Sequence, residues 1–263
     1  MNLFNLKKFL RQEKFFLFSI IFLFIFIRSL HFTSALNFSR DQAEFSLRAL
    51  EIWRNKEITL IGPTFSANIH GRYAFQGPLI YYFLLVFLLL TNFDPVAASY
   101  LFMLFCATMI IPLYFGTKWL LGKPAAYTLA ILYTLLPYYI NYTRFIWNPN
   151  FQLAFSALVI GAMGLFQKQK TKSSFFLLSC LLGLTLQLHY QFLLIIAGFW
   201  IYYFVIRKLS FHFFVLFLLG ISVGFSPLIL FELRNHFYNF QTVWLFLFNS
   251  EKTAHGSVSL SPH

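Results

Sequence analysis

Long apolar runs separated by short polar intervals are the feature that most restricts how this chain can fold. Hydrophobic residues make up 59% of the sequence and charged residues 11%, whereas a soluble domain has about 25% charged residues. Runs of this length indicate a polytopic membrane protein. The net charge of +12 then reflects how the loops are oriented across a membrane. We predict an all-α polytopic membrane protein without a nucleic-acid partner.

The candidate membrane segments differ in strength. They occupy residues 15–36, 77–91, 95–117, 124–143, 149–166, 174–189, 191–206 and 211–231. Segment 77–91 is the weakest, because as a helix it would reach only ~22 Å of a ~30 Å hydrocarbon core. The two cysteines, Cys106 and Cys180, lie inside apolar runs and are expected to be packing residues.

The distribution of charge predicts the orientation of these segments. If residues 77–91 dip into the outer leaflet and return, eleven of the twenty Lys and Arg residues lie on the cytoplasmic side, and seven of the eight carboxylates lie outside. This arrangement satisfies the positive-inside rule. We therefore predict about seven transmembrane helices, with the amino end inside. The outer face would comprise residues 37–94, 144–149, 189–191 and 232–263.

The chain divides into membrane and surface segments, with no soluble domain visible. A cytoplasmic tail (1–14) precedes the first transmembrane helix (15–36) and an extracytoplasmic loop with juxtamembrane helices (37–94). A transmembrane helical bundle (95–249) and a polar tail (250–263) follow. The tail suggests a chain cut before a further hydrophobic half.

The extracytoplasmic loop holds the main candidate for chemistry. Ser39 and Gln42 have the spacing of a capping box, which predicts a helix starting at Arg40. Polar residues recur on one face of this helix at spacings of three and four, namely Asp41, Glu44, Arg48, Glu51 and Asn55. Glu44 is expected to pair with Arg48 one turn on. The helix dipole favours an ionised Asp41 in the first turn. An ordinary interfacial helix with solvated charges is the alternative.

Four further polar groups reach the same outer face in this topology. They are His70, Arg72 and Tyr73; Arg144 and Asn148; His189 and Tyr190; and Glu232, Arg234 and His236. Cations and imidazoles beside a carboxylate suit a phosphate head group. The alternatives are an interface anchor for Arg144, a satisfied interfacial histidine for His189 and solvated loop residues for the last group. Arg28 lies nearer mid-span and is expected to snorkel outward.

The order of these motifs resembles the family 39 type of integral-membrane glycosyltransferases, which includes protein O-mannosyltransferases and bacterial aminoarabinose transferases of the C-type fold. The resemblance rests on Arg40-Asp41-Gln42, the segment from Gly77 to Tyr82, the segment from Thr143 to Asn150 and the segment from Phe231 to His236. It covers the chain as an amino-terminal portion and implies that Asp41 is the catalytic aspartate.

The chain departs from the family pattern at three places, one of which is Asn148 or Asn150, where the family often has an acidic residue after the third span. Gln42 stands where the family often has Glu, so Glu44 is the candidate for a second carboxylate. Gln76-Gly77-Pro78 replaces the Glu-Lys-Pro of the aminoarabinose type. A divalent metal ion is therefore left open as a cofactor, and no other cofactor is expected.

The sequence and the resemblance together predict a membrane glycosyltransferase, in a bacterial plasma membrane, that works on the extracytoplasmic face. A sugar would move with inversion from a polyprenyl-phosphate donor to a hydroxyl of a glycan, lipid or protein acceptor. Asp41 and Glu44 are the catalytic candidates. Donor phosphate would bind Arg72, Arg144 and Arg234. The substrate pocket would hold His70, Tyr73, Asn148, His189, Tyr190, Glu232 and His236.

Two other functions remain open at this point. The first is a transporter of lipid-linked sugars or polysaccharides, which should place paired charges mid-span along a path. Apart from Arg28, the spans are almost free of charge. The second is a non-catalytic subunit or fragment that binds the donor lipid without turnover.

Overall fold

The computed structural model describes residues 3–69 and 71–249, which form a mainly helical chain with one two-stranded antiparallel sheet. The first part comprises α1 (Leu3–Ser29), α2 (Arg40–Asn55), β1 (Thr64–Ile69), β2 (Arg72–Phe75) and α3 (Leu79–Leu90). The middle comprises α4 (Pro95–Thr108), α5 (Ile110–Leu121), α6 (Lys123–Leu135), α7 (Pro137–Tyr142) and α8 (Asn148–Gln169). The last part comprises α9 (Lys172–Leu188), α10 (Phe192–Trp200), the π-helix η1 (Ile201–Ile206), α11 (Phe211–Gly224), α12 (Ser226–Arg234) and α13 (Tyr238–Asn249).

Membrane-length helices are present, although fewer than the predicted seven. Two described helical segments are long and apolar enough to cross a bilayer. The first is Pro95–Leu121, which comprises α4 and α5, and the second is α8, Asn148–Gln169. The pair α11 and α12 is a third if its 75° bend belongs to one span. Shorter apolar helices occupy Leu79–Leu90, Lys172–Leu188 and Phe192–Ile206. The structure thus supports membrane-helix character, and the count of seven spans stays a prediction.

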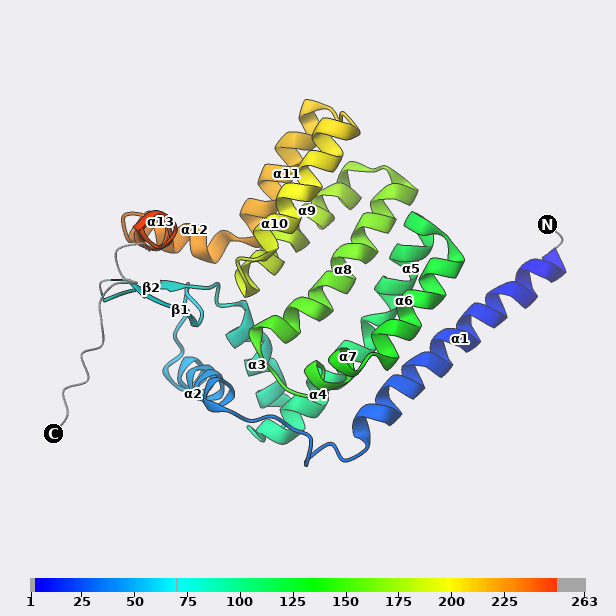
Figure 1. Cartoon of the computed structure of the whole chain (residues 1–263), viewed down its shortest axis with the longest axis horizontal. Helices are drawn as coiled ribbons and strands as arrows, with labels where there is room; N and C mark the ends of the chain where they lie inside the picture. The colour runs from blue at the N-terminus through cyan, green and yellow to red at the C-terminus, as the bar shows by residue number, and fades with distance from the viewer. Residues whose placement is uncertain (1–2, 70, 250–263) are drawn as a thin grey trace, which may run out of the picture.

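The turns of the chain gather at two opposite ends of the bundle (Figure 1). One end holds the start of α1 and the α5–α6, α8–α9 and η1–α11 connections, and we call it the lysine-rich end for the cations in these turns. The other end holds α2, the β1–β2 hairpin and the α7–α8 and α9–α10 connections, and we call it the α2 end. These are the groupings that the charge distribution predicts.

Helix α3 belongs to the α2 end. The N–H of Gly77, just before α3, donates to the carbonyl of Gln187 near the end of α9 at 2.8 Å. After α3, the Asp94 side chain caps α4 by accepting the N–H of Val96 at 2.8 Å. The 12 residues of α3 extend only ~18 Å as a helix. This length is shorter than a ~30 Å hydrocarbon core, and whether α3 crosses a membrane stays a prediction.

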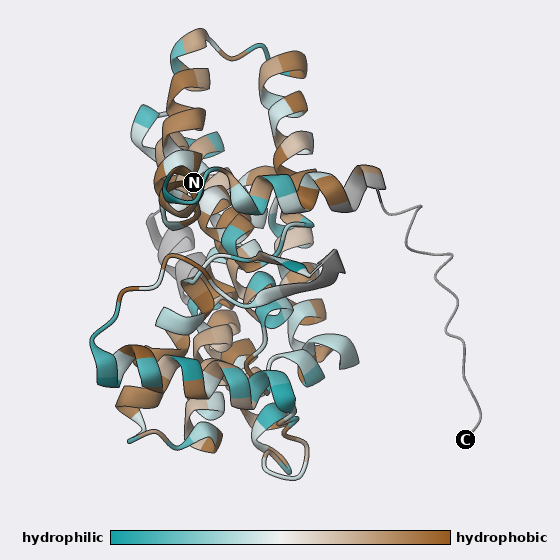
Figure 2. Ribbon diagram, turned by 90° about the vertical axis from the view of Figure 1, so that its left-hand side faces the viewer, coloured by the Kyte–Doolittle hydropathy of each residue, from teal (hydrophilic) through white to brown (hydrophobic). Residues whose placement is uncertain are grey.

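Glycines allow the central helices to pack backbone to backbone. A Cβ on Gly116 of α5 would lie 2.3 Å from the carbonyl oxygen of Ile160 in α8, which is far inside contact distance. Where α4 meets the start of α8 the core is rich in aromatic rings, such as the Phe102–Phe151 pair with centroids 4.6 Å apart. Figure 2 shows largely hydrophobic bundle helices and a hydrophilic stripe along α2. This division places the polar chemistry on α2 and its neighbours.

Arg28 is fully buried, which corrects the expectation that it snorkels outward. Its Nε donates to Thr143 Oγ1 at 2.6 Å, and its Nη1 donates to the carbonyl of Thr134 at 3.0 Å. The guanidinium also lies 3.3 Å from the centroid of the Phe24 ring. These acceptors lie near the end of α6 and at the end of α7, so the side chain joins helices instead of reaching water.

Candidate functional site

A cavity of about 310 Å³ lies at the α2 end, between the first turns of α2, the hairpin and the start of α8. This volume lies at the lower end of the ~300–1,000 Å³ range of small-molecule sites. The lining residues are Arg40, Asp41, Glu44, Phe45, Pro63, Thr64, Gln76, Trp147, Asn148, Pro149 and His189. Four predicted site residues therefore meet in one place, namely Asp41, Glu44, Asn148 and His189.

The capping box sets the position of the two carboxylates. Gln42 Oε1 accepts the backbone N–H of Ser39 at 2.8 Å, and α2 begins at Arg40, which confirms the predicted start. Gln42, Phe45, Ala49 and Ile52 are buried, and α2 packs on α3. Asp41 and Glu44 consequently lie on the exposed side of the helix, where they line the cavity.

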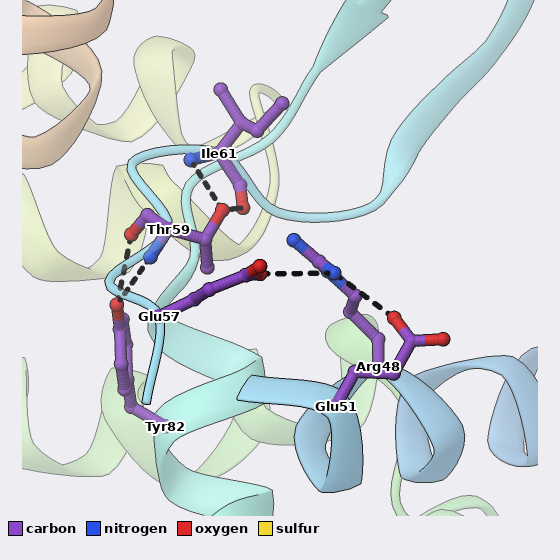
Figure 3. Close-up of polar contacts among 6 residues, drawn as sticks. All are labelled: Arg48, Glu51, Glu57, Thr59, Ile61 and Tyr82. Carbon is purple, nitrogen blue, oxygen red and sulfur yellow. Dashed lines mark hydrogen bonds and ion pairs between the residues drawn. The ribbon is translucent and has the colours of Figure 1, made fainter. Parts of the chain in front are cut away.

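Arg48 pairs with residues further along the chain, and the predicted Glu44–Arg48 pair is wrong (Figure 3). Its Nη1 lies 2.9 Å from Glu51 Oε2 and 3.7 Å from Glu57 Oε2. The chain turns after α2 and brings Glu57 back beside the helix. Arg48 therefore lies near two carboxylates that follow it in the sequence. Within the described residues Glu44 has no ion pair, and its carboxylate is available to the cavity.

A tyrosine of α3 fixes the loop that returns from α2 to the hairpin (Figure 3). The Tyr82 hydroxyl accepts the N–H of Thr59 at 3.0 Å and donates to the Thr59 carbonyl at 2.9 Å. The Thr59 hydroxyl in turn donates to the Ile61 carbonyl at 2.9 Å. These bonds hold the segment just before Pro63 and Thr64, which form one wall of the cavity.

Trp147 connects α8 to the Asp41 carboxylate. It is the residue that caps α8, and its Nε1–H donates to Asp41 Oδ2 at 3.1 Å. A hydrogen bond to a charged acceptor stabilises by about 1.5–3 kcal/mol when buried and by less at an exposed group such as Asp41. The contact therefore orients the carboxylate through Oδ2.

Two buried amides form the polar part of the cavity wall. Asn148 and Gln76 are only 5% and 7% exposed, and Asn148 Nδ2 donates to Gln76 Oε1. The backbone of Gln76 is held on both sides, because Gly62 N–H donates to its carbonyl at 2.8 Å and its own N–H donates to Pro63 O at 2.9 Å. Asn148 Oδ1 has no hydrogen-bond partner among the described residues. This acceptor is itself buried behind the cavity wall.

His189 completes the wall as a neutral imidazole. Burial lowers the pKa of His189 below its ordinary value, so the ring is uncharged at neutral pH. Its Nδ1 accepts the N–H of Gln191 at 3.3 Å, which leaves the ring proton on Nε2. The side chain therefore offers a hydrogen-bond donor without a charge.

The three arginines predicted to bind phosphate lie outside the cavity lining. Arg144 Nη2 donates to the carbonyls of Ile27 at 3.1 Å and Leu30 at 3.2 Å, so it ties the α7–α8 connection to the end of α1. Arg72 lies over the Tyr238 ring at 4.6 Å from its centroid. Arg234 is exposed in the last turn of α12. The backbone carbonyls at a helix end explain the burial of Arg144.

Other predicted pocket residues hold α12 and α13 against the hairpin. The Tyr190 hydroxyl donates to the Phe75 carbonyl and accepts from Asn239 Nδ2 at 2.7 Å. Burial raises the pKa of Tyr190 to about 12, so the phenol keeps its proton. The Glu232 carboxylate accepts the N–H groups of Asn239 at 3.2 Å and Phe240 at 3.1 Å, and so caps α13.

The remaining predicted residues contribute no wall to the cavity. Tyr73 is 43% exposed on β2. His236 has a φ of 51° in the α12–α13 turn, and its carbonyl accepts from Gln241 Nε2 at 3.0 Å. His70 lies outside the described residues.

Seven of the eleven lining residues were not among the predicted site residues, and three of these have large side chains that carry a polar group, namely Arg40, Gln76 and Trp147. Each stands beside a residue that was selected or inside a quoted motif, so chain neighbourhood was the available signal. The described part of the chain gathers no group of three or more His, Cys, Asp or Glu side chains that could hold a metal ion. No ligand set for a divalent ion is therefore assigned.

Comparison with protein-family models, curated proteins and solved structures gave no match to this chain.

Proposed function

We propose that the chain is a membrane glycosyltransferase that moves a sugar from a polyprenyl-phosphate donor to an acceptor hydroxyl on the extracytoplasmic face. The observation that supports this most is the cavity at the α2 end. There a helix start, a strand end and the cap of a distant helix bring Asp41, Gln76 and Trp147 to one space. The sugar and the acceptor are proposed to meet in this cavity, and the α2 end is proposed to face outward.

The chemical groups of the lining suit a sugar. The carboxylates of Asp41 and Glu44 can accept from sugar hydroxyls, and the amides of Gln76 and Asn148 belong to the same wall. The indole of Trp147 offers an apolar face with a polar edge. The neutral His189 adds a donor without attracting charge. One small ring fits this set of groups better than a flat aromatic ligand, because most of the wall is polar.

In the proposed reaction, Asp41 acts as the general base. It accepts the proton of the acceptor hydroxyl as that oxygen attacks the anomeric carbon with inversion. The bond from this carbon to the phosphate oxygen breaks, and its electron pair leaves with the polyprenyl phosphate. General-base catalysis typically accelerates a reaction by about 10²–10⁴-fold. The Trp147 N–H holds Asp41 in position for this transfer.

Arg40 is proposed to bind the donor phosphate. It is the one Arg or Lys among the residues that line the cavity. Because the negative charge on the phosphate grows as the glycosidic bond breaks, a guanidinium there stabilises the transition state more than the ground state. We therefore assign to Arg40 the role that the sequence gave to Arg72, Arg144 and Arg234.

The proposal can be tested with the purified full chain in liposomes. The assay would supply radiolabelled polyprenyl-phosphate mannose, glucose or aminoarabinose together with lipid and glycan acceptors. We expect transfer from at least one donor and release of polyprenyl phosphate. We also expect inversion at the anomeric carbon, which NMR of the product would detect. Retention of configuration would contradict the direct attack assisted by Asp41. Donor binding without turnover by any of the sugars would instead identify a non-catalytic donor-lipid protein.

A further inference from the structure

The lysine-rich end has far more cations than carboxylates. Glu13 is the one carboxylate of the described residues at this end, and it lies 2.8 Å from Lys118 Nζ and 2.9 Å from Lys123 Nζ. Five more cations occur in the nearby turns, namely Lys168, Lys170, Lys172, Arg207 and Lys208. None of these five lies within ion-pair distance of a described carboxylate. The end therefore has a positive charge that an anion can neutralise.

A groove of about 290 Å³ opens in this charged region between α9 and α11. Nearer the α2 end these helices pack closely, because a Cβ on Gly220 would lie 2.4 Å from Ser179 Cβ and one on Gly224 would lie 2.2 Å from the Cys180 carbonyl. The groove begins beyond these glycines, where α11 carries larger side chains. It is lined by Lys172, Phe211, His212, Val215 and Leu216.

The groove is polar at one end and apolar along its length. Lys172 and His212 supply a cation and an imidazole, whereas Val215 and Leu216 form an apolar wall. The apolar surface continues along α11, where Leu218 and Leu219 are 49% and 53% exposed. A soluble anion would use only the polar end. An amphiphile with a negative head group would use both ends, so the groove matches an anionic lipid.

We propose that this groove binds an anionic phospholipid. The head-group phosphate lies between Lys172 and His212, and an acyl chain follows Val215 and Leu216 along α11. Basic pockets between membrane helices bind such head groups in the same way. The site lies at the opposite end of the bundle from the Asp41 cavity and is independent of sugar transfer.

Native mass spectrometry of the full chain in detergent tests the site. The protein would be titrated with phosphatidylglycerol or phosphatidylcholine, with inorganic phosphate as a competitor. We expect phosphatidylglycerol to bind more tightly than phosphatidylcholine. In Lys172→Gln the affinity for phosphatidylglycerol should fall approximately fivefold, which is the contribution of one cation near an anionic head group. Val215→Trp, which fills the groove without changing charge, should weaken the same binding. Inorganic phosphate at millimolar concentration should not displace the lipid.

Lys168→Gln is the matched control. Lys168 is exposed at the same end, lies 4.5 Å from the Trp119 ring centroid and does not line the groove. Its replacement should leave phosphatidylglycerol binding unchanged. An equal loss in Lys168→Gln and Lys172→Gln would show attraction by diffuse charge alone and overturn the site. Wild-type affinity in Lys172→Gln, or displacement by inorganic phosphate, would also overturn it.

Discussion

Arg40 and Arg144 have the same charge, but their surroundings give them different roles. Arg144 donates to two backbone carbonyls of the α1 end, whereas Arg40 is exposed at the start of α2 and lines the cavity. From the sequence, Arg144 was predicted to bind the donor phosphate, whereas Arg40 was expected only to begin a helix. The choice between them depends on which carbonyls lie within reach, and this is a property of the assembled helices.

Replacing Arg40 tests its proposed role as the phosphate ligand. Arg40→Gln should lower kcat/KM for the lipid-phosphate sugar by about 10–100-fold, the effect of removing a charged hydrogen bond of ~1.5–3 kcal/mol. Steady-state kinetics with varied donor concentration measure this value. Arg234→Gln, an exposed arginine away from the cavity, should retain wild-type kinetics. Equal losses in both variants would indicate a general effect of surface charge.

The carboxylate part of the site could be predicted from local sequence alone. The spacing of Ser39 and Gln42 fixed the start of α2, and the start of α2 fixed the face that presents Asp41 and Glu44. Trp147 and Gln76 could not be selected in this way. Their contacts with Asp41 and Asn148 join positions 106 and 72 residues apart, and no local pattern encodes such a distance.

At the scale of elements, residues 124–143 and 211–231 were each predicted as one continuous segment, but the structure breaks both, and the hairpin was not predicted. Pro137 at the start of α7 and Pro227 in the first turn of α12 mark breaks because proline lacks the N–H that would continue a helix. The hairpin did leave a signal, since polar and apolar residues alternate from Thr64 to Ile69 before Gly71. The surrounding acidic and apolar segments favoured surface helices, and this short alternation was overlooked.

Close packing of α5 on α8 can be tested by adding one methyl group. Gly116→Ala should destabilise the protein by about 1–3 kcal/mol, because the new Cβ would lie 2.3 Å from the Ile160 carbonyl oxygen. Gly198→Ala is the control, since no atom lies within 4 Å of its Cβ position. It should be neutral or slightly stabilising. Thermal unfolding in detergent compares the two, and equal melting temperatures would contradict the packing described.

The link between α1, α5 and α6 predicts a pH dependence. Burial raises the pKa of Glu13, but hydrogen bonds from Lys118 and Lys123 more than offset burial, so the net pKa lies below its ordinary 4.5. Because the folded-state pKa is depressed, the stabilisation is present above pH 4.5 and is lost as the pH falls through the lower value.

Glu13→Gln tests this dependence directly. At pH 7 the variant should be less stable by about 1–3 kcal/mol, less than the ~3–5 kcal/mol of a fully buried pair because both lysines are partly exposed. Near pH 3 the variant and the wild type should converge. Glu51→Gln breaks only an exposed pair and should change stability by less than about 1 kcal/mol. A difference for Glu13→Gln that persists unchanged at pH 3 would exclude the ion pairs as its cause.

At the scale of the whole molecule, charge alone separated the two ends of the bundle. The lysine-rich turns gather at one end, whereas six of the seven carboxylates of the described residues belong to α2, to the loops after α2 and α3, or to α12, at the other end (Figure 1). The number of spans could not be obtained in this way, because breaks and bends such as the 75° angle between α11 and α12 depend on packing.

The proposed orientation predicts opposite labelling of the two ends. In sealed vesicles of known orientation, a membrane-impermeant maleimide should reach Arg54→Cys on α2 from the outside and Lys170→Cys in the α8–α9 turn only from the inside. Both positions are exposed, whereas native Cys106 is buried. The wild-type chain controls for reaction at half-buried Cys180. Labelling of both variants from the same side would rule out this orientation.

The rate of sugar transfer by Asp41→Asn tests the central assignment most directly. Asparagine keeps the size of the side chain and can still accept the Trp147 N–H, but it cannot accept a proton from the acceptor hydroxyl. We predict a fall in kcat of about 10²–10⁴-fold, with little change in donor binding. Glu51→Gln, on the same helix but paired with Arg48 away from the cavity, should keep wild-type activity. Full activity in Asp41→Asn would contradict the account.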